Sequence, residues 1–376
     1  MIYFDYAATS RNKPNASLDG FLHYINDVGV SPGRGSYKTA IDASRMLYQA
    51  RKTVSKFFNS PNNTDVVFTK NSTEALNMFL FGFLNKGDHV LISPYEHNAV
   101  FRPINKLKEL GIIDYTVIPE SIIYDEPHNI TRLITDKTKL YISTLASNLT
   151  GQYVFSSIIS KILSQNKITV LVDASQGAGK KTIDMQRDYI DYVAFTGHKD
   201  LYAVPGVGGL VCCESLKIEP LIQGGTGIHG DDYTNPHVFP EAYEAGTLNM
   251  PAIWSLKNSI DYINENIVFI RDKEKKLTEY FISNLSMIPG VIIYNQNRER
   301  LSTFCFNINR ISSSDVVKYL SDNDVCVRGG IHCAIKAHET IGTVKTGAVR
   351  VSLSFFNDCD EIDLFVDLIR ELIKCI

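Results

Sequence analysis

The sequence contains neither an apolar run long enough to cross a membrane nor a paired cysteine motif. The longest apolar-looking run, residues 75–84, includes Asn77 and is far shorter than the roughly 20 residues of a membrane span. The first residues, Met1 to Asp5, carry no basic stretch and no long apolar stretch, so we expect no signal peptide. The seven scattered cysteines form no CxxC pair, which excludes a disulfide scaffold and a simple zinc ribbon. A reducing cytoplasm is the expected location, and we expect no metal site.

An excess of positive charge is also missing. The 38 basic and 41 acidic residues give a net charge of −3, so neither nucleic acid nor an anionic membrane surface is an expected partner. The sequence has no internal repeats, no low-complexity tract and no G-x-G-x-x-G or P-loop motif, which disfavours a nucleotide. What is present is a chain of 376 residues, 44% of them apolar, which is enough for a sizeable core.

Short β-rich apolar runs alternate with helical patterns between residues 64 and 215. Such alternation is typical of a mostly parallel, doubly wound α/β sheet, in which ligands bind outside the carboxyl ends of the strands. We therefore predict a large domain over residues 15–250 with a mostly parallel, seven-stranded sheet. The predicted strands are 66–69, 90–93, 115–118, 140–143, 169–172, 192–196 and 209–212.

The pattern changes after residue 250. Apolar residues at helical spacing run from Ile263 to Leu285, and strand-like segments follow at 291–294, 303–308, 325–328 and 348–354. Helices are predicted at 315–320 and from about 358 to 374, the latter with acidic residues in its first turn and Lys374 near its end. We predict a smaller α+β C-terminal domain over residues 251–376, joined by the N-terminal segment 1–14.

Chemically versatile side chains follow several of the predicted strands. Ser72 and Thr73 begin a helix, either as a plain cap or as an anion site. His97 is either surface decoration or the aromatic wall of a site. Asp173 follows four apolar residues and needs a cationic or N–H partner if it is buried. Lys199 is either a solvated surface group or an amine nucleophile with a lowered pKa.

Taken together, these residues indicate more than any one of them does. A pyridoxal phosphate site needs a lysine for the aldehyde, a carboxylate for the ring nitrogen, a helix terminus for the phosphate and an aromatic side chain against the ring. The predicted sheet edge offers this set through Lys199, Asp173, the helix that starts at Ser72, and His97. We therefore predict that pyridoxal 5'-phosphate is the cofactor.

The C-terminal region adds a cysteine and an arginine with open interpretations. Cys333 is either a small buried hydrophobe or a reactive thiol that Arg328 and His332 favour as a thiolate. Arg350 interrupts an apolar strand, where it either binds a carboxylate ligand or forms a structural salt bridge. The other cysteines are expected to be structural or incidental, at Cys212, Cys213, Cys305, Cys326, Cys359 and Cys375.

At this point the motifs resemble the class V aminotransferases of the fold type I pyridoxal phosphate enzymes, and within them the cysteine desulfurases and selenocysteine lyases. The resemblance extends along nearly the whole chain. Its motifs, in order, are Tyr3 to Ala8, Asn71 to Ala75, Glu96 to Asn98, Ser147-Asn148, Asp173 to Gln176, Thr196 to Lys199, Tyr243 to Thr247, Arg328 to Cys333 and Arg350 to Leu353.

The resemblance implies a role for each matched residue. Lys199 would bind the cofactor aldehyde and move the substrate Cα proton, with His97 assisting proton transfer. Cys333 would accept the substrate sulfur with Arg328 beside it, and Arg350 would clamp the α-carboxylate. The implied cofactor contacts are Asp173 at the ring nitrogen, Gln176 at the ring hydroxyl, His97 on the ring face, Asn148 at cofactor or substrate, Ser72, Thr73, Thr196 and His198 at the phosphate, and Thr247 at the phosphate of a partner subunit.

The reaction implied by the resemblance is desulfuration of L-cysteine to L-alanine, with a persulfide on Cys333 for iron–sulfur cluster or thio-cofactor assembly. A homodimer is implied, and the short Arg-x-Gly-x-His-Cys spacing resembles the branch that uses a separate sulfur acceptor protein. Alternatives on the same cofactor are selenocysteine lyase acting on L-selenocysteine, C–S lyase and aminotransferase. A non-catalytic binding protein is a further alternative, against which the presence of Lys199 and Asp173 argues.

Overall fold

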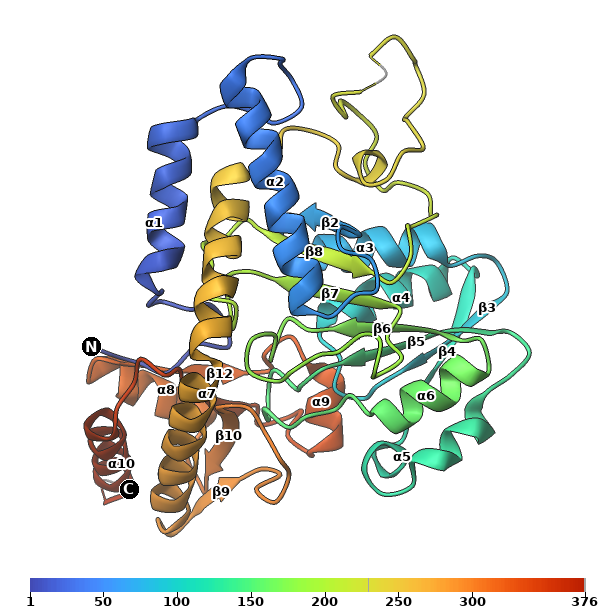
Figure 1. The fold of residues 1–376 in the computed structure, drawn as a ribbon. Helices are drawn as coiled ribbons and strands as arrows, with labels where there is room; N and C mark the ends of the chain where they lie inside the picture. Colours follow the sequence, from blue (N-terminus) through green and yellow to red (C-terminus); the bar gives the residue numbers. More distant parts are fainter. Residues whose placement is uncertain (229, 375–376) are drawn as a thin grey trace.

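The fold is described from a computed structural model that covers residues 1–228 and 230–374. Seven strands form one sheet in the order β2-β8-β7-β6-β5-β3-β4 (Figure 1). Strand β8 is antiparallel to both of its neighbours, and every other neighbouring pair is parallel. The predicted mostly parallel, seven-stranded α/β sheet is therefore confirmed. The strands are β2 (Val66–Thr69), β3 (Asp88–Ile92), β4 (Ile113–Val117), β5 (Thr138–Thr144), β6 (Thr169–Asp173), β7 (Tyr192–Thr196) and β8 (Gly208–Cys212).

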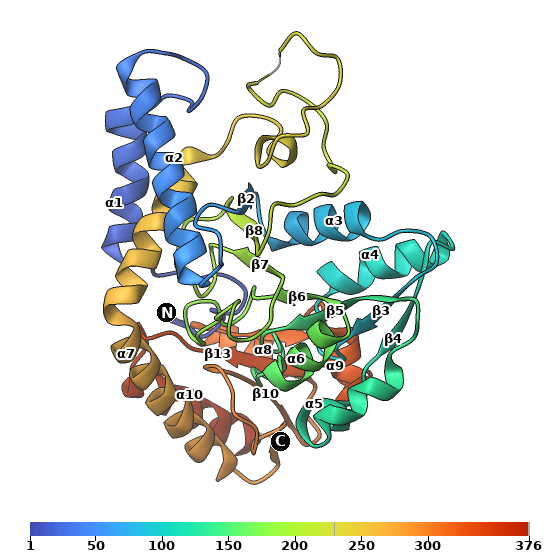
Figure 2. The same ribbon diagram turned by 45° about the vertical axis from the view of Figure 1, so that its right-hand side comes forward.

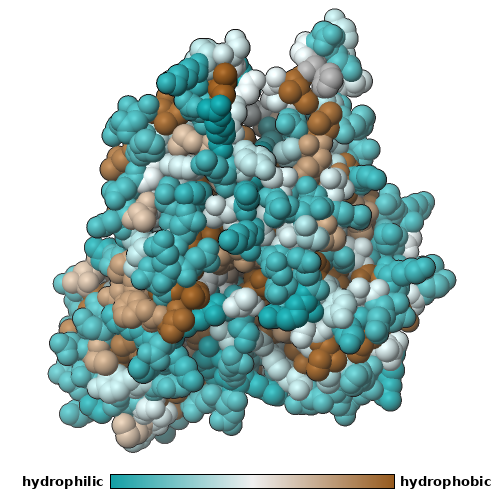
Figure 3. Space-filling model, in the orientation of Figure 1, coloured by the Kyte–Doolittle hydropathy of each residue, from teal (hydrophilic) through white to brown (hydrophobic). Residues whose placement is uncertain are grey.

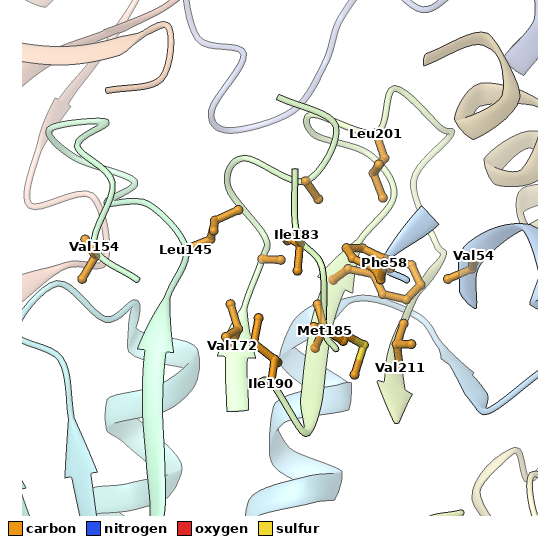
Figure 4. Packing of buried hydrophobic residues seen from close by; sticks show 14 of the residues in the cluster. Val54, Phe58, Leu145, Val154, Val172, Ile183, Met185, Ile190, Leu201 and Val211 are labelled. Carbon is orange, nitrogen blue, oxygen red and sulfur yellow. The ribbon is translucent and has the colours of Figure 1, made fainter. Parts of the chain in front are cut away.

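Helices cover both faces of this sheet because its central strands are apolar on both sides. One face packs against α2 (Lys38–Phe57), α6 (Ser157–Gln165) and the first half of α7 (Met250–Ser286). Figure 4 shows this core, where Val54 and Phe58 meet strand residues such as Val211. The other face packs against α3 (Ser72–Phe83) and α4 (Asn98–Glu109). The remaining helices between β1 and β8 are α1 (Asn15–His23), η1 (Tyr24–Val28), α5 (Glu120–Tyr124) and η2 (Pro127–Leu133).

A second, antiparallel sheet lies in the C-terminal region, in the order β12-β13-β10-β9. The prediction of a single strand at 325–328 is wrong. The segment splits into β11, which pairs with the N-terminal β1, and β12, which pairs with β13, so the chain changes sheets within four residues. The elements of this region are β1 (Ile2–Tyr3), β9 (Val291–Ile293), β10 (Thr303–Ile308), α8 (Ser313–Asp322), β11 (Val325–Cys326), β12 (Arg328–Gly330), α9 (Ile335–Thr340), β13 (Ala348–Ser352) and α10 (Cys359–Lys374). The short helix η3 (Glu241–Tyr243) precedes α7, and its Tyr243 packs against the core of the large sheet.

Helix α7 runs from one core into the other, as Figure 2 shows. Its early residues Ile253 and Leu256 pack in the core of the large sheet, whereas Leu277 and Phe281 pack with Phe4 of the N-terminal segment in the C-terminal core. The boundary at residue 250 stays a prediction, since a single helix joins the two cores.

The face of the molecule drawn in Figure 3 is mostly hydrophilic, with scattered apolar side chains. The segment between β8 and η3 extends away from the sheet (Figures 1 and 2) and exposes Leu221, Ile222 and Tyr233. Within the described ranges, no helix combines the length and the apolar character that a bilayer crossing requires.

A buried ion pair joins Arg51 of α2 to Glu244, which lies in the segment before α7 and also contacts β2. Arg51 Nη1 lies 2.8 Å from Glu244 Oε1, Arg51 Nη2 contacts Oε2, and the amide of Phe68 donates to Oε1 at 2.6 Å. Both side chains are less than a tenth exposed.

We predict that Glu244→Ala lowers the free energy of unfolding by about 3–5 kcal/mol, because the Arg51 charge then stays in the core without a carboxylate, with only the carbonyl of Val66 as its acceptor. Chemical denaturation of the apoprotein at pH 7 measures this loss. Asp42→Ala removes the exposed partner of Arg45 on the same helix, α2, and should cost less than about 1 kcal/mol. Equal losses in the two variants would contradict the prediction.

Candidate active site

The carboxyl ends of the parallel strands bring the predicted cofactor residues together around one cavity of about 160 Å³. This arrangement follows from the topology, because the loops after parallel strands meet at one edge of the sheet. All predicted cofactor residues line the cavity except Thr247, which lines a neighbouring cavity of about 500 Å³ together with Asn71 and His198. The lining residues are Asn71, Ser72, Thr73, His97, Ala99, Thr144, Asn148, Asp173, Ser175, Gln176, Thr196, His198 and Lys199.

The start of α3 lies against β8 because residue 208 is a glycine. A Cβ atom on Gly208 would lie only 2.7 Å from the backbone of Asn71. Asn71 caps the helix, with its Oδ1 accepting from the amide of Glu74 at 3.0 Å. The capping function therefore belongs to Asn71, and the hydroxyl-bearing Ser72 and Thr73 face the cavity.

Asp173 ends β6 and is buried, with hydroxyl and amide groups as its partners. Its Oδ1 accepts from Ser72 Oγ at 3.1 Å, from Ser175 Oγ at 2.6 Å and from the amide of Ser175 at 3.0 Å. The expected need for a partner is met by N–H and O–H donors rather than by a cation. Ser175 was not singled out from the sequence, although a hydroxyl residue two positions after the aspartate was the available signal.

Burial lowers the pKa values of the basic groups in the cavity. Burial lowers the pKa of Lys199, which Asp173 partly opposes and Arg350 and Arg328 reinforce. Burial and the nearby Lys199 lower the pKa of His97 to about 4. The amide of Ala99 donates to His97 Nδ1 at 3.0 Å, so the neutral ring carries its proton on Nε2. A lowered pKa increases the fraction of neutral lysine amine near pH 7, and only the neutral amine acts as a nucleophile or a base.

Glu96 is a buried carboxyl that the sequence did not single out. Its Oε1 accepts from Ser93 Oγ at 2.5 Å and from the amide of Thr144, whereas Oε2 has no partner. Burial raises the pKa of Glu96 to about 8, and Asp173 adds to the rise. The side chain therefore holds a proton at neutral pH directly before His97.

This proton makes the stability of the apoprotein depend on pH in a defined direction. The folded protein keeps it up to about pH 8, whereas the unfolded chain releases it near 4.5. The contribution of Glu96 to the free energy of unfolding therefore falls as pH rises through that window, by roughly 1.4 kcal/mol per pH unit, and is constant above it.

Glu96→Gln should remove this fall, so denaturation of the apoprotein between pH 5 and 9 should show the wild type losing free energy of unfolding relative to the variant as the pH rises. Glu109→Gln, at an exposed position, serves as the control and should keep the wild-type slope. Parallel slopes for wild type and Glu96→Gln would contradict the assignment.

Cys333 lies in a separate cleft of about 460 Å³ that shares Thr73, His97 and Ala99 with the cofactor cavity. The thiol residue is half-buried, and its carbonyl accepts from the amide of Asn98 at 2.8 Å. Of the cysteines expected to be structural, Cys212 and Cys305 are buried, Cys213 and Cys326 are half-buried, Cys359 is exposed, and Cys375 lies outside the described residues.

Arg350 is buried in β13 with two partners. Its Nη2 lies 2.5 Å from Asp5 Oδ1, its Nη1 donates to the carbonyl of Asn148 at 3.0 Å, and its Nε has no partner. The structural salt bridge is therefore present, and the unpartnered Nε leaves a donor for a ligand. Arg328 pairs with Arg350 across β12 and β13, and neither residue lines the 160 Å³ cavity.

The residues around the cavity match the chemical groups of pyridoxal phosphate. Lys199 offers an amine for the aldehyde, Asp173 a carboxylate for the ring nitrogen, and the start of α3 offers hydroxyl and N–H groups for the phosphate. The hydroxyl Oγ1 of Thr196 is buried in the cavity wall without a partner. An orphaned buried hydroxyl is costly, which indicates a ligand at this position.

The fold and this site define an α/β enzyme with a buried lysine at the carboxyl edge of a mostly parallel sheet. The family model of class V aminotransferases matches residues 2–365, and the chain belongs to that family.

The relatives are similar over nearly their full lengths. A protein of Methanothermobacter thermautotrophicus named "Probable cysteine desulfurase" is 32% identical, with 99% of this chain and 94% of that protein covered. One of Synechocystis with the same name is 29% identical, with 100% and 91% covered. The solved apo structure of cysteine desulfurase from Thermococcus onnurineus is 27% identical, covers 100% of this chain and 95% of that chain, and has a TM-score of 0.90.

Proposed function

We propose that this protein is a pyridoxal-phosphate-dependent cysteine desulfurase that converts L-cysteine to L-alanine and leaves the sulfur on Cys333. The observation that carries the proposal is the half-buried Cys333 in a cleft that shares three residues with the cavity of Lys199. In this proposal the thiol accepts the sulfur of a substrate bound at Lys199, across the walls that the cleft and the cavity share. The names of the similar proteins support the same reaction.

The residues of the cavity divide the work of binding. Asp173 and Gln176 hold the cofactor ring, His97 lies against its face, and Asn148 orients cofactor or substrate. The phosphate is held by Ser72, Thr73, Thr196 and His198. When bound, the cofactor supplies a ring that withdraws electrons from the substrate Cα. Lys199 would bind the cofactor aldehyde and would carry the Cα proton, a task that its lowered pKa favours.

The sulfur transfer requires Cys333 as a thiolate. Its sulfur attacks the sulfur of L-cysteine, an S–S bond forms, and the C–S bond of the substrate breaks. The electron pair of that bond stays with the carbon, which takes up a proton and is released as L-alanine. Arg350 holds the substrate carboxylate with Arg328 nearby. L-Cysteine and the Cys333 thiol thus become L-alanine and the Cys333 persulfide, and no external oxidant is needed.

The proposal includes the surroundings in which the enzyme works. We place it in the cytoplasm as a homodimer in which Thr247 reaches the cofactor phosphate of the partner subunit. The exposed apolar side chains between β8 and η3 suit such an interface. The persulfide then passes to a sulfur acceptor protein for iron–sulfur cluster or thio-cofactor assembly.

The test supplies the purified protein with pyridoxal phosphate, L-cysteine and dithiothreitol and measures L-alanine and sulfide together. Equal amounts of both products are expected. Pyruvate with ammonia would show a C–S lyase, alanine from L-selenocysteine alone would show a selenocysteine lyase, and amino transfer to a keto acid would show an aminotransferase. Failure to bind the cofactor at all would contradict the enzyme assignment.

A further inference from the structure

Two buried imidazoles lie beside Cys333, outside the cavity of Lys199. His332 Nδ1 lies 3.5 Å from His338 Nε2, and the ring planes differ by only 10°. The ring centres are 5.7 Å apart, whereas the two facing nitrogens are 3.5 Å apart. The difference is about two ring radii, as expected for rings that lie side by side in nearly one plane. The two nitrogens therefore face each other edge to edge. His332 is 3% exposed and His338 is fully buried.

The backbone carbonyl of Arg328 determines which nitrogen of His332 carries the proton. His332 Nε2 lies 3.1 Å from the carbonyl oxygen of Arg328, which can only accept, so Nε2 must carry a proton. In a neutral ring Nδ1 then accepts, so the facing Nε2 of His338 must donate. His338 Nδ1 accepts in turn from Thr343 Oγ1 at 2.7 Å. The neutral form suits the site, because burial lowers the pKa of both rings, that of His332 to about 3.

This chain of three hydrogen bonds spans the turn that carries Cys333. His332 and Cys333 both have positive φ angles, 56° and 55°. Residues other than glycine rarely adopt such angles, because the Cβ atom makes them unfavourable. The turn therefore needs external bonds to persist. Asn148 Nδ2 donates to the carbonyl of His332, and the amide of Asn98 donates to that of Cys333, each at 2.8 Å. These two bonds fix the backbone, whereas the imidazole chain fixes the side chain of His332.

We propose that His338 is a positioning residue, which donates a proton from Nε2 to His332 and thereby holds the Cys333 turn in its left-handed conformation. The proposal rests on the proposed function only in taking Cys333 as the sulfur acceptor. His338 touches neither substrate nor cofactor in this account, and its effect passes through His332 alone.

The first test reads the protons directly in the wild-type protein. Nitrogen NMR of protein labelled only in its nine histidines distinguishes the two neutral tautomers of each ring. Loss of signals in His338→Gln and in His332→Gln assigns the pair. We expect both rings to carry the proton on Nε2 between pH 6 and 9. A proton on Nδ1 of either ring would overturn the proposal.

The second test measures the rate at which iodoacetamide alkylates Cys333 in the apoprotein, by peptide mass spectrometry with Cys359 as the exposed internal reference. His338→Gln can place an amide N–H where Nε2 lies, whereas His338→Asn can place a carbonyl oxygen where Nδ1 lies. We therefore expect Asn to raise the Cys333 rate several-fold by freeing the turn and Gln to leave it near the wild-type value.

Equal rates in wild type and both variants, or equal increases in both, would overturn the proposal, because the donated proton would then not be what holds the turn. Thermal unfolding of each variant separates loss of the turn from loss of the fold, and the wild-type tautomers decide the matter if neither variant folds. Neither readout involves turnover. A failure of the proposed desulfurase reaction therefore appears in the alanine and sulfide assay and leaves both of these results intact.

Discussion

Cys333→Ala is expected to lower the production of L-alanine from L-cysteine at least about a thousand-fold, since it removes the nucleophile that accepts the sulfur. The expected loss is confined to sulfur transfer. Cys333 does not line the cavity of Lys199. Among the described residues, the cleft that contains Cys333 shares only Thr73, His97 and Ala99 with that cavity. Cofactor binding should therefore survive the substitution.

The measurement compares alanine and sulfide production in the presence of dithiothreitol with the cofactor content and thermal unfolding of each variant. Cys359→Ala removes an exposed thiol on α10 and should keep full activity. Turnover of L-cysteine that does not depend on Cys333 would refute its role as sulfur acceptor and would favour a C–S lyase. A variant that loses both activity and cofactor would refute the separation of the two sites.

Lys199→Ala is expected to abolish turnover, with a loss of at least about a thousand-fold, because one side chain both attaches the cofactor and carries the Cα proton. The surrounding contacts support noncovalent binding without it. Asp173 is held by Ser72 and Ser175, and the start of α3 keeps its hydroxyl and N–H groups. The variant should therefore still bind pyridoxal phosphate, but without a covalent bond.

Borohydride reduction followed by peptide mass spectrometry tests this expectation without relying on activity. In the wild type the added pyridoxyl mass should appear on the peptide that contains Lys199, and in Lys199→Ala it should be absent. Lys70→Ala, at an exposed lysine near the start of α3, should leave the label on Lys199. Labelling of another lysine in the wild type would show that Lys199 is not the attachment site.

The strands of the large sheet could be predicted closely because each is encoded by its own residues. The runs 66–69 and 192–196 form strands with the predicted bounds, since a continuous apolar run flanked by polar residues suits a strand buried on both faces. The same reasoning was wrong at 325–328, where β1 pairs with the first half and β13 with the second. A local pattern carries no information about which partner a strand selects.

The candidate site was predicted as far as its members follow strands of one sheet. Ser72, His97, Asp173 and Lys199 were all placed at the carboxyl edge, because parallel strands bring their ends to that edge. Glu96 and Ser175 also follow strands, but they were missed because a position after a strand does not reveal their burial or their hydrogen bonds.

The sequence by itself determined the α/β class, the seven strands and the reactive side chains at their ends, because these follow from short-range patterns of apolar and polar residues. Only the tertiary structure decided what those side chains contact. Asp5 meets Arg350 across 345 positions of the chain, and Asn98 meets the turn of Cys333. Such contacts form between segments whose separation in sequence says nothing of their distance in space.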